Sequence, residues 1–188
     1  VAFDSIEDYR DIETLNIYHE LVHEKGMAPQ EVLAILHAKS RDNARTPMQW
    51  DDRPQAGFTS GVPWIKVNPN YREINVRQAL ADPDSIFHFY RKLIRLRREN
   101  PVMVYGRYDL LLEDHPQIYA FTRTLDNDRL LVVLNFSRQE SLFELPNEMV
   151  FSSAELLISN YPVEAGQDLQ SVELRPYEAR VYRLKGHG

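Results

Sequence analysis

The spacing of apolar residues predicts two amphipathic helices at the start of the chain. The first runs from Asp8 to Lys25 and ends before Gly26, and one of its faces carries Ile12, Leu15, Tyr18, His19 and Val22. Pro29 suits the first turn of the second helix, whose apolar positions are Val32, Leu33, Ile35 and Leu36. Each helix therefore has one face to bury against another element.

A long stretch without apolar periodicity follows, from Pro47 to Ala81. It holds many of the chain's prolines and glycines, so we expect a long loop, and loops of that length are usually functional or disordered. Both tryptophans lie in it and favour order. Asp82 and Pro83 then predict the cap and first position of another helix, with a wide apolar face formed by Ile86, Phe87, Phe89, Tyr90, Leu93 and Ile94.

From Val102 onward the pattern changes to short runs of strand type separated by turn residues. Residues 126–128 (Asp-Asn-Asp) are typical of a tight hairpin turn. Regularly spaced short strands with polar turns predict an antiparallel sandwich. The expected strands are Tyr105–Leu112, Ile118–Thr124, Arg129–Phe136, Ser141–Leu145, Glu155–Ile158, Val172–Leu174 and Ala179–Leu184.

Composition narrows the class of protein without indicating an activity. Hydrophobic residues make up 43% and charged residues 27% of the chain, as in ordinary globular proteins. The chain has no cysteine, which excludes disulfides and thiolate-bound metals and suits a reducing compartment. A net charge of −6 argues against binding to nucleic acid, and no apolar run approaches the length of a membrane span. We therefore expect a cytoplasmic protein that binds neither nucleic acid nor membrane.

Two arginines, Arg41 and Arg45, precede a break at Thr46 and Pro47. On an α-helix they would share one face, because side chains at i and i+4 lie on the same side. Two fixed guanidinium groups beside an ordered loop suit the recognition of carboxylates, phosphates or sugar hydroxyls. The alternative is an arginine pair that binds neighbouring acids and holds the loop, and the residue types alone favour this structural interpretation.

The same segment carries a family resemblance. The first motif that matches is residues 41–50 (Arg-Asp-Asn-Ala-Arg-Thr-Pro-Met-Gln-Trp). Further short segments that match motifs of the same family follow at residues 56–59, 63–65, 67–71, 74–76, 84–87, 104–106 and 174–179. The match also reaches upstream to residues 3–4 and 9–16. With these motifs in the same order along nearly the whole chain, the sequence resembles the oligo-1,6-glucosidase group of glycoside hydrolase family thirteen, in the α-amylase superfamily.

The resemblance implies a mixed fold and a domain division. A complete (β/α)8 TIM barrel takes about 250 residues, and the chain matches only the last third of the family's sequences. Residues 1–101 would be the C-terminal end of the barrel, namely the segment after its last strand together with the final barrel helix. Residues 102–188 would be the all-β antiparallel sandwich domain that follows the barrel.

This placement has a direct chemical consequence. Retaining glycosidases need a nucleophilic carboxylate and an acid about 5–5.5 Å apart. The resemblance places these residues on earlier barrel strands, so we expect no catalytic residue in this chain and no hydrolysis by the chain alone. It implies no metal or other cofactor.

The resemblance also assigns candidate substrate-binding residues. Arg41 matches the arginine that holds the hydroxyls of the terminal glucose and closes the cleft beyond it, and Glu13 matches an acid that approaches the next sugar. Arg45 would support this wall through ion pairs. Trp50 and Trp64 could stack on sugars, although anchoring of the loop is the simpler role.

The expected function is that of an exo-acting α-glucosidase that releases terminal α-1,6-linked glucose from short isomalto-oligosaccharides. Trehalose-6-phosphate hydrolase is the nearest alternative, sucrose isomerases and transglucosidases share the scaffold, and a carbohydrate-binding or interaction module is the alternative from another class. The expected partners are an oligosaccharide and the missing barrel. Without the barrel, the apolar face of the Ile86–Ile94 helix would be uncovered, so we expect either a homodimer through this face or disorder in much of residues 1–80.

A second motif suggests metal binding instead of sugar binding. Residues 19–23 read His-Glu-Leu-Val-His, the zinc-binding pattern of metallopeptidases on a helix. A third ligand would fall at Pro29, which cannot bind a metal. His19 lies on the apolar stripe of the predicted helix, where a packed histidine is the simpler interpretation, so we expect no metal site.

Overall fold

The computed structural model describes residues 3–164 and 166–186. The chain forms two compact units, one ending at His88 and the other beginning at Phe89. The predicted boundary between residues 101 and 102 concerns family domains rather than compact units, and it stays a prediction. Within the described part of the chain, no helix is both long and apolar enough to cross a membrane.

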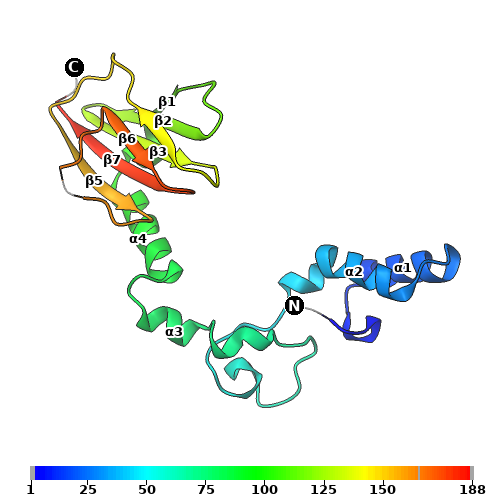
Figure 1. Cartoon of the computed structure of the whole chain (residues 1–188). Coiled ribbons are helices and arrows are strands. Elements are labelled where there is room, and N and C mark those ends of the chain that lie inside the picture. The colour runs from blue at the N-terminus through cyan, green and yellow to red at the C-terminus, as the bar shows by residue number, and fades with distance from the viewer. Residues whose placement is uncertain (1–2, 165, 187–188) are drawn as a thin grey trace. The chain divides into compact units, whose positions relative to one another are not determined.

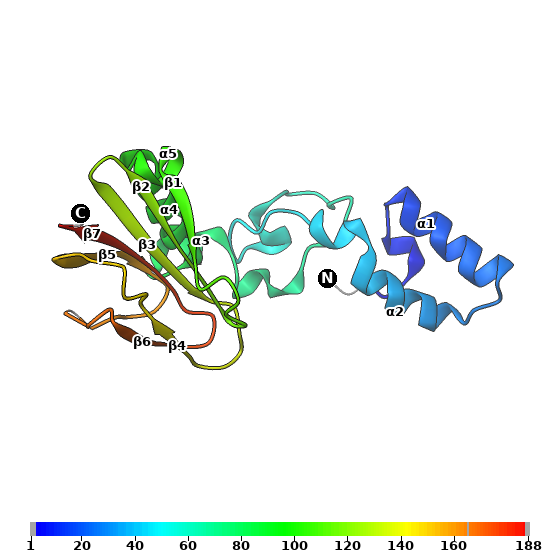
Figure 2. The ribbon, with the colours of Figure 1, turned by 90° about the horizontal axis from the view of Figure 1, so that it is seen from above.

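The first unit begins with a pair of helices that lie side by side (Figures 1 and 2). A short 3-10 turn, η1 (Ile6–Asp8), precedes α1 (Ile12–His19), which continues as a π-helical turn, η2 (Glu20–Glu24). The second helix, α2 (Pro29–Lys39), has Pro29 in its first turn and buries Val32, Leu33 and Leu36, as the sequence predicts. These three side chains pack with Phe3, Tyr9 and Ile65 in the small core of this unit.

The predicted face of the first helix is partly wrong. The helix begins at Ile12 rather than at Asp8, because the carboxylate of Asp11 caps it by accepting the backbone N–H of Thr14. Thr14 is buried, whereas Ile12 is 69% exposed and His19 also lies at the surface. Burial of Thr14 turns the inward face toward Tyr18 and Leu21, so His19 is not the packed histidine that we expected.

The stretch from Pro47 to Ala81 is an ordered loop interrupted by short helical turns. It contains η4 (Pro54–Gly57), η5 (Pro69–Arg72) and one regular helix, α3 (Val76–Ala81), and it is preceded by η3 (Arg41–Ala44). The sequence prediction missed α3, although the side chain of Asn75 provides a normal N-terminal cap by accepting the N–H of Gln78.

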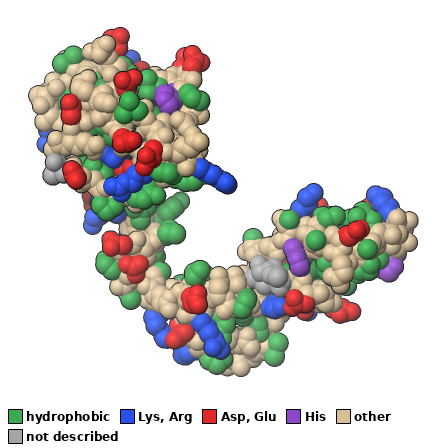
Figure 3. Space-filling model, in the orientation of Figure 1, with side chains coloured by type: hydrophobic (Ala, Val, Ile, Leu, Met, Phe, Trp, Pro, Cys, Tyr) green, Lys and Arg blue, Asp and Glu red, His purple; other side chains and the backbone are tan. Residues whose placement is uncertain are grey.

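The long amphipathic helix, α4, spans Ile86–Glu99 and none of its residues is buried. It begins at Ile86 rather than at Pro83, because Asp82 accepts the N–H of Asp84 at 2.9 Å and holds a turn before the helix. Hydrophobic side chains are visible along the α4 segment (Figure 3). The exposed members are Ile86, Phe87, Tyr90, Leu93 and Ile94.

The second unit contains all seven predicted strands, within a few residues of their expected bounds. They are β1 (Arg107–Leu111), β2 (Ile118–Leu125), β3 (Asp128–Asn135), β4 (Ser141–Glu144), β5 (Ser153–Ser159), β6 (Ser171–Leu174) and β7 (Ala179–Lys185). The one clear difference is at the start, where Val102–Tyr105 form a short helix, α5, and the first strand begins after Gly106.

The strands form the predicted antiparallel sandwich. A five-stranded sheet has the order β1-β2-β3-β7-β5, and β4 pairs with β6 in a smaller sheet. The core between the sheets is apolar and includes Ile118, Leu131, Phe143, Leu174 and Leu184. Figure 2 shows α5 on one side of the large sheet and the β4-β6 sheet on the other.

Candidate functional site

The two residues that the resemblance assigns to sugar binding form an ion pair. Nη2 of Arg41, in η3, lies 2.5 Å from Oε2 of Glu13, in the first turn of α1. Both side chains remain more than half exposed, at 63% and 54%. Because a guanidinium has five donors and Glu13 occupies one edge, Arg41 keeps donors that can reach a sugar hydroxyl.

Arg45 does not share a helical face with Arg41, so that expectation is wrong. The helix α2 ends at Lys39, the extended backbone of Ser40 breaks the helical path, and Arg41–Ala44 form a 3-10 turn. Arg45 instead points to two buried acids: its Nη1 lies 3.1 Å from Oδ1 of Asp11 and 3.6 Å from Oδ1 of Asp42.

Asp42 joins the arginine turn to the segment before α1. Its Oδ2 accepts the backbone N–H groups of Arg10 at 2.6 Å and Asp11 at 2.8 Å, and its side chain is fully buried. The N–H of Asp42 in turn donates to Oγ of Ser40. These bonds fix the register between the start of α1, which carries Glu13, and the turn that carries Arg41.

A second set of hydrogen bonds surrounds Asp11. Its Oδ2 accepts the hydroxyl of Thr14 at 2.9 Å, and the Thr14 and Ser40 hydroxyls are 2.9 Å apart. Burial raises the pKa of Asp11, but the bonds from Thr14 and Arg45 outweigh it and hold this pKa below its ordinary value. The acid is therefore charged at neutral pH.

Sequence reasoning did not select Asp42, Asp11 or Thr14. A signal was present, because an Asp three residues before Thr is a common start to a helix, and Asp42 stands inside the arginine motif. The contact between residues 10–11 and residue 42 depends on the tertiary fold, and the spacing of residue types does not encode it.

The loop after the motif is held by a third acid, Asp51. Its carboxylate accepts Nη2 of Arg53 at 2.7 Å and Nη2 of Arg77 at 3.0 Å, and the bond from Arg53 is the largest cause that lowers the pKa of Asp51. Gly57 has a φ of +65°, and a Cβ there would come within 2.6 Å of Oδ1 of Asp51. Only glycine fits this position without a shift.

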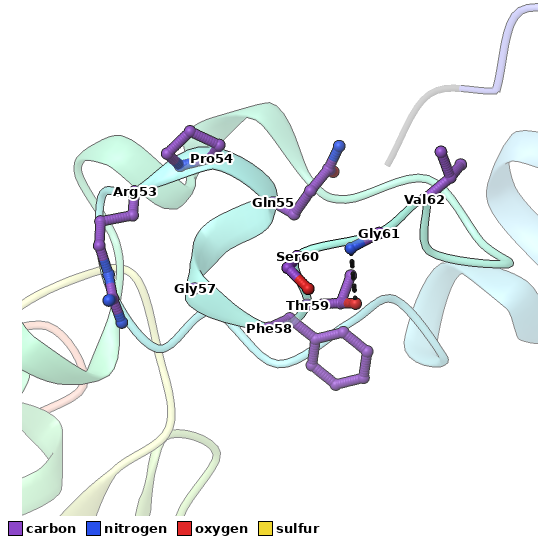
Figure 4. Close-up of a pocket in the computed structure, with 9 residues that line it drawn as sticks. All are labelled: Arg53, Pro54, Gln55, Gly57, Phe58, Thr59, Ser60, Gly61 and Val62. Carbon is purple, nitrogen blue, oxygen red and sulfur yellow. Dashed lines mark hydrogen bonds between the residues drawn. The ribbon is translucent and has the colours of Figure 1, made fainter.

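Beside this acid, residues 53–55 and 57–62 line an open hollow of about 710 Å³ (Figure 4). Its lining includes Arg53 and Phe58, and the N–H of Gly61 donates to Oγ1 of Thr59. Trp50 is 50% exposed and Trp64 is 63% exposed. Both rings are thus available to a ligand or to another part of the protein, and their role stays a prediction.

The two histidines of the segment His-Glu-Leu-Val-His lie close to each other at the surface. The rings of His19 and His23 lie 5.1 Å apart, and Nδ1 of His19 is 3.6 Å from Oε1 of Glu24. Among the described residues, no group of three or more His, Cys, Asp or Glu side chains is arranged to hold a metal ion.

The arginine motif lies within a match to a known protein family. The alpha amylase catalytic domain model matches residues 9–106, which include η3 and the whole hydrogen-bonded network around Asp42. The chain belongs to the α-amylase family. The maltogenic amylase C-terminal domain model matches residues 108–181 of this family member. The predicted fold class is thereby confirmed: the end of a catalytic domain precedes a C-terminal β-domain.

Relatives of this α-amylase family member support the finer resemblance. It is 58% identical over 185 residues to the oligo-1,6-glucosidase of Parageobacillus thermoglucosidasius, a match that covers 98% of this chain and 33% of that protein. It is 48% identical over 184 residues to the trehalose-6-phosphate hydrolase of Bacillus subtilis, covering 97% of this chain and 32% of that protein. The resemblance to oligo-1,6-glucosidases is confirmed.

Solved structures agree with the fold. The crystal structure of the trehalose-6-phosphate hydrolase of Bacillus licheniformis superposes with a TM-score of 0.87 at 44% identity, over 98% of this chain and 33% of that one. The chain thus spans about a third of the length of the relatives that it matches.

Proposed function

We propose that this chain forms one wall of the active site of an exo-acting α-glucosidase of the oligo-1,6-glucosidase type. The observation that carries the proposal is the 58% identity to the Parageobacillus oligo-1,6-glucosidase over 98% of this chain. The intact enzyme would release terminal α-1,6-linked glucose from short isomalto-oligosaccharides. Its two catalytic carboxylates would come from the part of the relatives that this chain does not cover, so the chain alone is inactive.

Arg41 has the chemistry for its proposed part in this site. A planar, permanently charged fork can hold two hydroxyls of the terminal glucose in fixed geometry. Glu13 fixes one edge of the fork and would approach the next sugar, while Arg45 neutralises Asp11 and Asp42 behind it. The buried hydrogen bonds around Asp42 hold Arg41 in a fixed position relative to the start of α1. A fixed position is required if Arg41 is to exclude longer oligosaccharides from the cleft.

Trehalose-6-phosphate hydrolysis is the second candidate, favoured by the superposition on the Bacillus licheniformis enzyme. Two chimeras separate the candidates. The 188 residues replace the matching third of the Parageobacillus oligo-1,6-glucosidase in one and of the Bacillus subtilis trehalose-6-phosphate hydrolase in the other. Each chimera is compared with its parent by kcat/KM on isomaltose or on trehalose 6-phosphate.

If these residues are adapted to isomaltose, the first chimera keeps kcat/KM within about tenfold of its parent. The kcat/KM of the second chimera then falls by more than about tenfold relative to its own parent. The reverse ranking would favour the phosphorylated substrate. Loss of activity in both chimeras, with cooperative unfolding intact, would contradict the proposal. Isothermal titration of the chain alone with isomaltose, maltose and trehalose 6-phosphate tests the carbohydrate-binding module, and our proposal predicts no measurable binding.

Further predictions about partners and location belong to this proposal. The exposed face of α4, with Ile86 83% and Tyr90 61% exposed, would pack against the rest of the barrel in the intact enzyme. In the isolated chain the same face would form a homodimer, which light scattering over a range of concentrations would detect. A cytoplasmic location stays a prediction.

A further inference from the structure

Two histidines at the end of the first helix form a pair that the proposed sugar site does not use. His19 is the last residue of α1, and His23 lies in the π-helical turn η2 that follows it. The centres of their rings are 5.1 Å apart, and both side chains are exposed. Imidazole is the commonest metal ligand in proteins, and two exposed rings at this distance can bind one ion together.

The separation of the two rings suits a shared metal ion. Zn²⁺ binds an imidazole nitrogen at about 2.0–2.1 Å, and the centre of the ring lies about 1 Å beyond that nitrogen. Two imidazoles on one tetrahedral ion therefore have their ring centres about 5 Å apart. The rings of His19 and His23 already have this separation and are tilted by 49° to each other. The backbone thus needs no movement to present both rings to one ion.

The π-helical turn holds the backbone that carries His23. The N–H of Lys25 donates to the carbonyl oxygen of Glu20 at 3.0 Å, which is the i to i−5 bond of such a turn. The side chains of the same two residues form an ion pair, with Lys25 Nζ 2.6 Å from Glu20 Oε1. Turns of this kind are rare and are frequent at functional sites.

The ion pair also distinguishes this site from that of a metallopeptidase. In the His-Glu-x-x-His pattern the glutamate is the general base that acts beside the metal. Here that residue is Glu20, and its hydrogen bond from Lys25 is the main cause that lowers its pKa. A carboxylate with a lowered pKa is a poor proton acceptor. The histidine pair therefore has the chemistry to bind a metal ion without hydrolysing a peptide.

The sequence argued against a metal here on two grounds, and the structure removes one of them. It placed His19 on a buried apolar stripe, whereas the side chain of His19 is 68% exposed. The other ground stands, because position 29 is a proline and supplies no third ligand. The carboxylate of Glu24 lies close by, with its Oε1 3.6 Å from Nδ1 of His19, and its negative charge favours a cation.

We propose that His19 and His23 form a binding site for one divalent transition-metal ion, whose remaining coordination positions are filled by water. Imidazole nitrogen suits Zn²⁺, Ni²⁺ and Cu²⁺, whereas Mg²⁺ and Ca²⁺ prefer oxygen ligands. The bound ion would link residues 19 and 23 and stabilise the turn between them. This inference does not depend on the proposed function, because neither histidine belongs to the site around Arg41.

Isothermal titration of the 188-residue chain with ZnCl₂, without a histidine tag, tests the inference. His19→Ala and His23→Ala each remove one of two ligands. Each should weaken zinc binding by at least about tenfold, since loss of a group that only supports a ligand already costs about 10–100-fold. His88→Gln is the matched control: it removes a histidine outside the pair, and glutamine can still donate to the carbonyl oxygen of Leu80, as His88 Nε2 does at 3.1 Å. Its zinc affinity should equal that of the parent.

The outcomes of this titration decide directly. Zinc affinity that falls in both pair variants and not in the control supports the inference. No zinc binding by the parent, equal affinity in all the variants, or a loss in only one of the two pair variants would overturn it. Binding of MgCl₂ that is lost in the same two variants would also overturn it, because nitrogen ligands do not select that ion. Far-UV circular dichroism checks that each variant keeps the helix content of the parent, as expected for exposed side chains.

A second measurement uses the unaltered chain. A paramagnetic ion such as Cu²⁺, added at a small fraction of the protein concentration, broadens the NMR signals of the ring protons of its ligands. The chain has six histidines, and the inference predicts that the ring signals of His19 and His23 broaden before those of the others. Earlier broadening of another histidine, or equal broadening of all six, would overturn it. The kcat/KM of the chimera on isomaltose is a separate measurement, so failure of the metal site would leave the proposed function standing.

Discussion

The carboxylate of Asp42 accepts the backbone N–H of Asp11 at 2.8 Å, across thirty-one residues of sequence. The same oxygen accepts the N–H of Arg10, so one buried side chain ties the arginine turn to the start of α1. The relative position of Arg41 and Glu13 follows from this bond, because each lies within a few residues of one of its two ends.

Replacing Asp42 therefore gives the first prediction. Asp42→Ala leaves two backbone N–H groups without their acceptor and should lower the free energy of unfolding of the first unit by roughly 3 kcal/mol. Both tryptophans lie in this unit, so the urea transition of the whole chain followed by tryptophan fluorescence reports on it alone. Asp52→Ala is the control, since Asp52 is 58% exposed and pairs with Arg77 at the surface. Equal effects of the two variants would refute a central role for Asp42.

The lowered pKa of Asp11 predicts acid sensitivity of the same unit. Because the folded carboxyl binds its proton less tightly than the unfolded one, its contribution to stability is complete above the ordinary aspartate pKa of about 4. That contribution is lost as the pH falls through the lowered folded pKa. Asp51, whose pKa is lowered chiefly by its bond from Arg53, acts in the same direction.

The variant Arg45→Gln isolates the part that comes from Asp11. It removes a cation that lowers the pKa of Asp11, so it should destabilise the first unit at pH 7 and make little difference in strong acid. Urea transitions at several pH values measure the difference in free energy of unfolding between the parent and the variant. A difference that stays constant as the pH falls would mean that Arg45 stabilises by packing rather than by charge.

The hydroxyl pair of Tyr108 and Tyr119 predicts an effect in alkali. The hydrogen bond with Tyr119 raises the pKa of Tyr108 to about 12. A raised folded pKa means that this contribution to stability is complete below the ordinary tyrosine pKa of about 10. It is lost as the pH rises toward the folded value.

Tyr119→Phe should bring the pKa of Tyr108 back toward about 10. The pKa is read from the tyrosinate absorbance that disappears when Tyr108→Phe is added to either background. Tyr105→Phe serves as the control, because Tyr105 is 77% exposed on α5. An unchanged pKa of Tyr108 in the Tyr119→Phe variant would show that the hydroxyl pair is not formed in solution.

The β-domain could be predicted from sequence because its signal is local. In β2, buried Ile118, Ala120 and Thr122 alternate with more exposed residues, and that period of two is visible in the sequence. The short helix α5 was missed, because its Val-Met-Val-Tyr sequence is equally typical of a strand. Hydrogen bonds from Arg123 to the carbonyl oxygens of Met103 and Val104 hold that conformation, and these tertiary contacts are not visible in the local sequence.

The candidate site was less accessible to prediction. The role of Arg41 comes from the resemblance, whereas spacing alone placed Arg41 and Arg45 on one face of an α-helix that ends before them. The inward face of α1 was displaced because a polar residue, Thr14, is buried by its bonds to Asp11 and Ser40. Patterns of apolar residues do not register a polar side chain that is buried by hydrogen bonds.

The central claim, that Arg41 holds the terminal glucose, is tested most directly by kcat/KM of the Parageobacillus chimera on isomaltose with Arg41→Lys. A lysine keeps the charge and loses the fork, so we predict a loss of about 100-fold. The control Lys25→Ala breaks a similar exposed ion pair, 2.6 Å from Lys25 Nζ to Glu20 Oε1, and should change kcat/KM less than about twofold. Thermal melting should be unchanged in both variants. An Arg41→Lys chimera that keeps the kcat/KM of its parent would contradict the account.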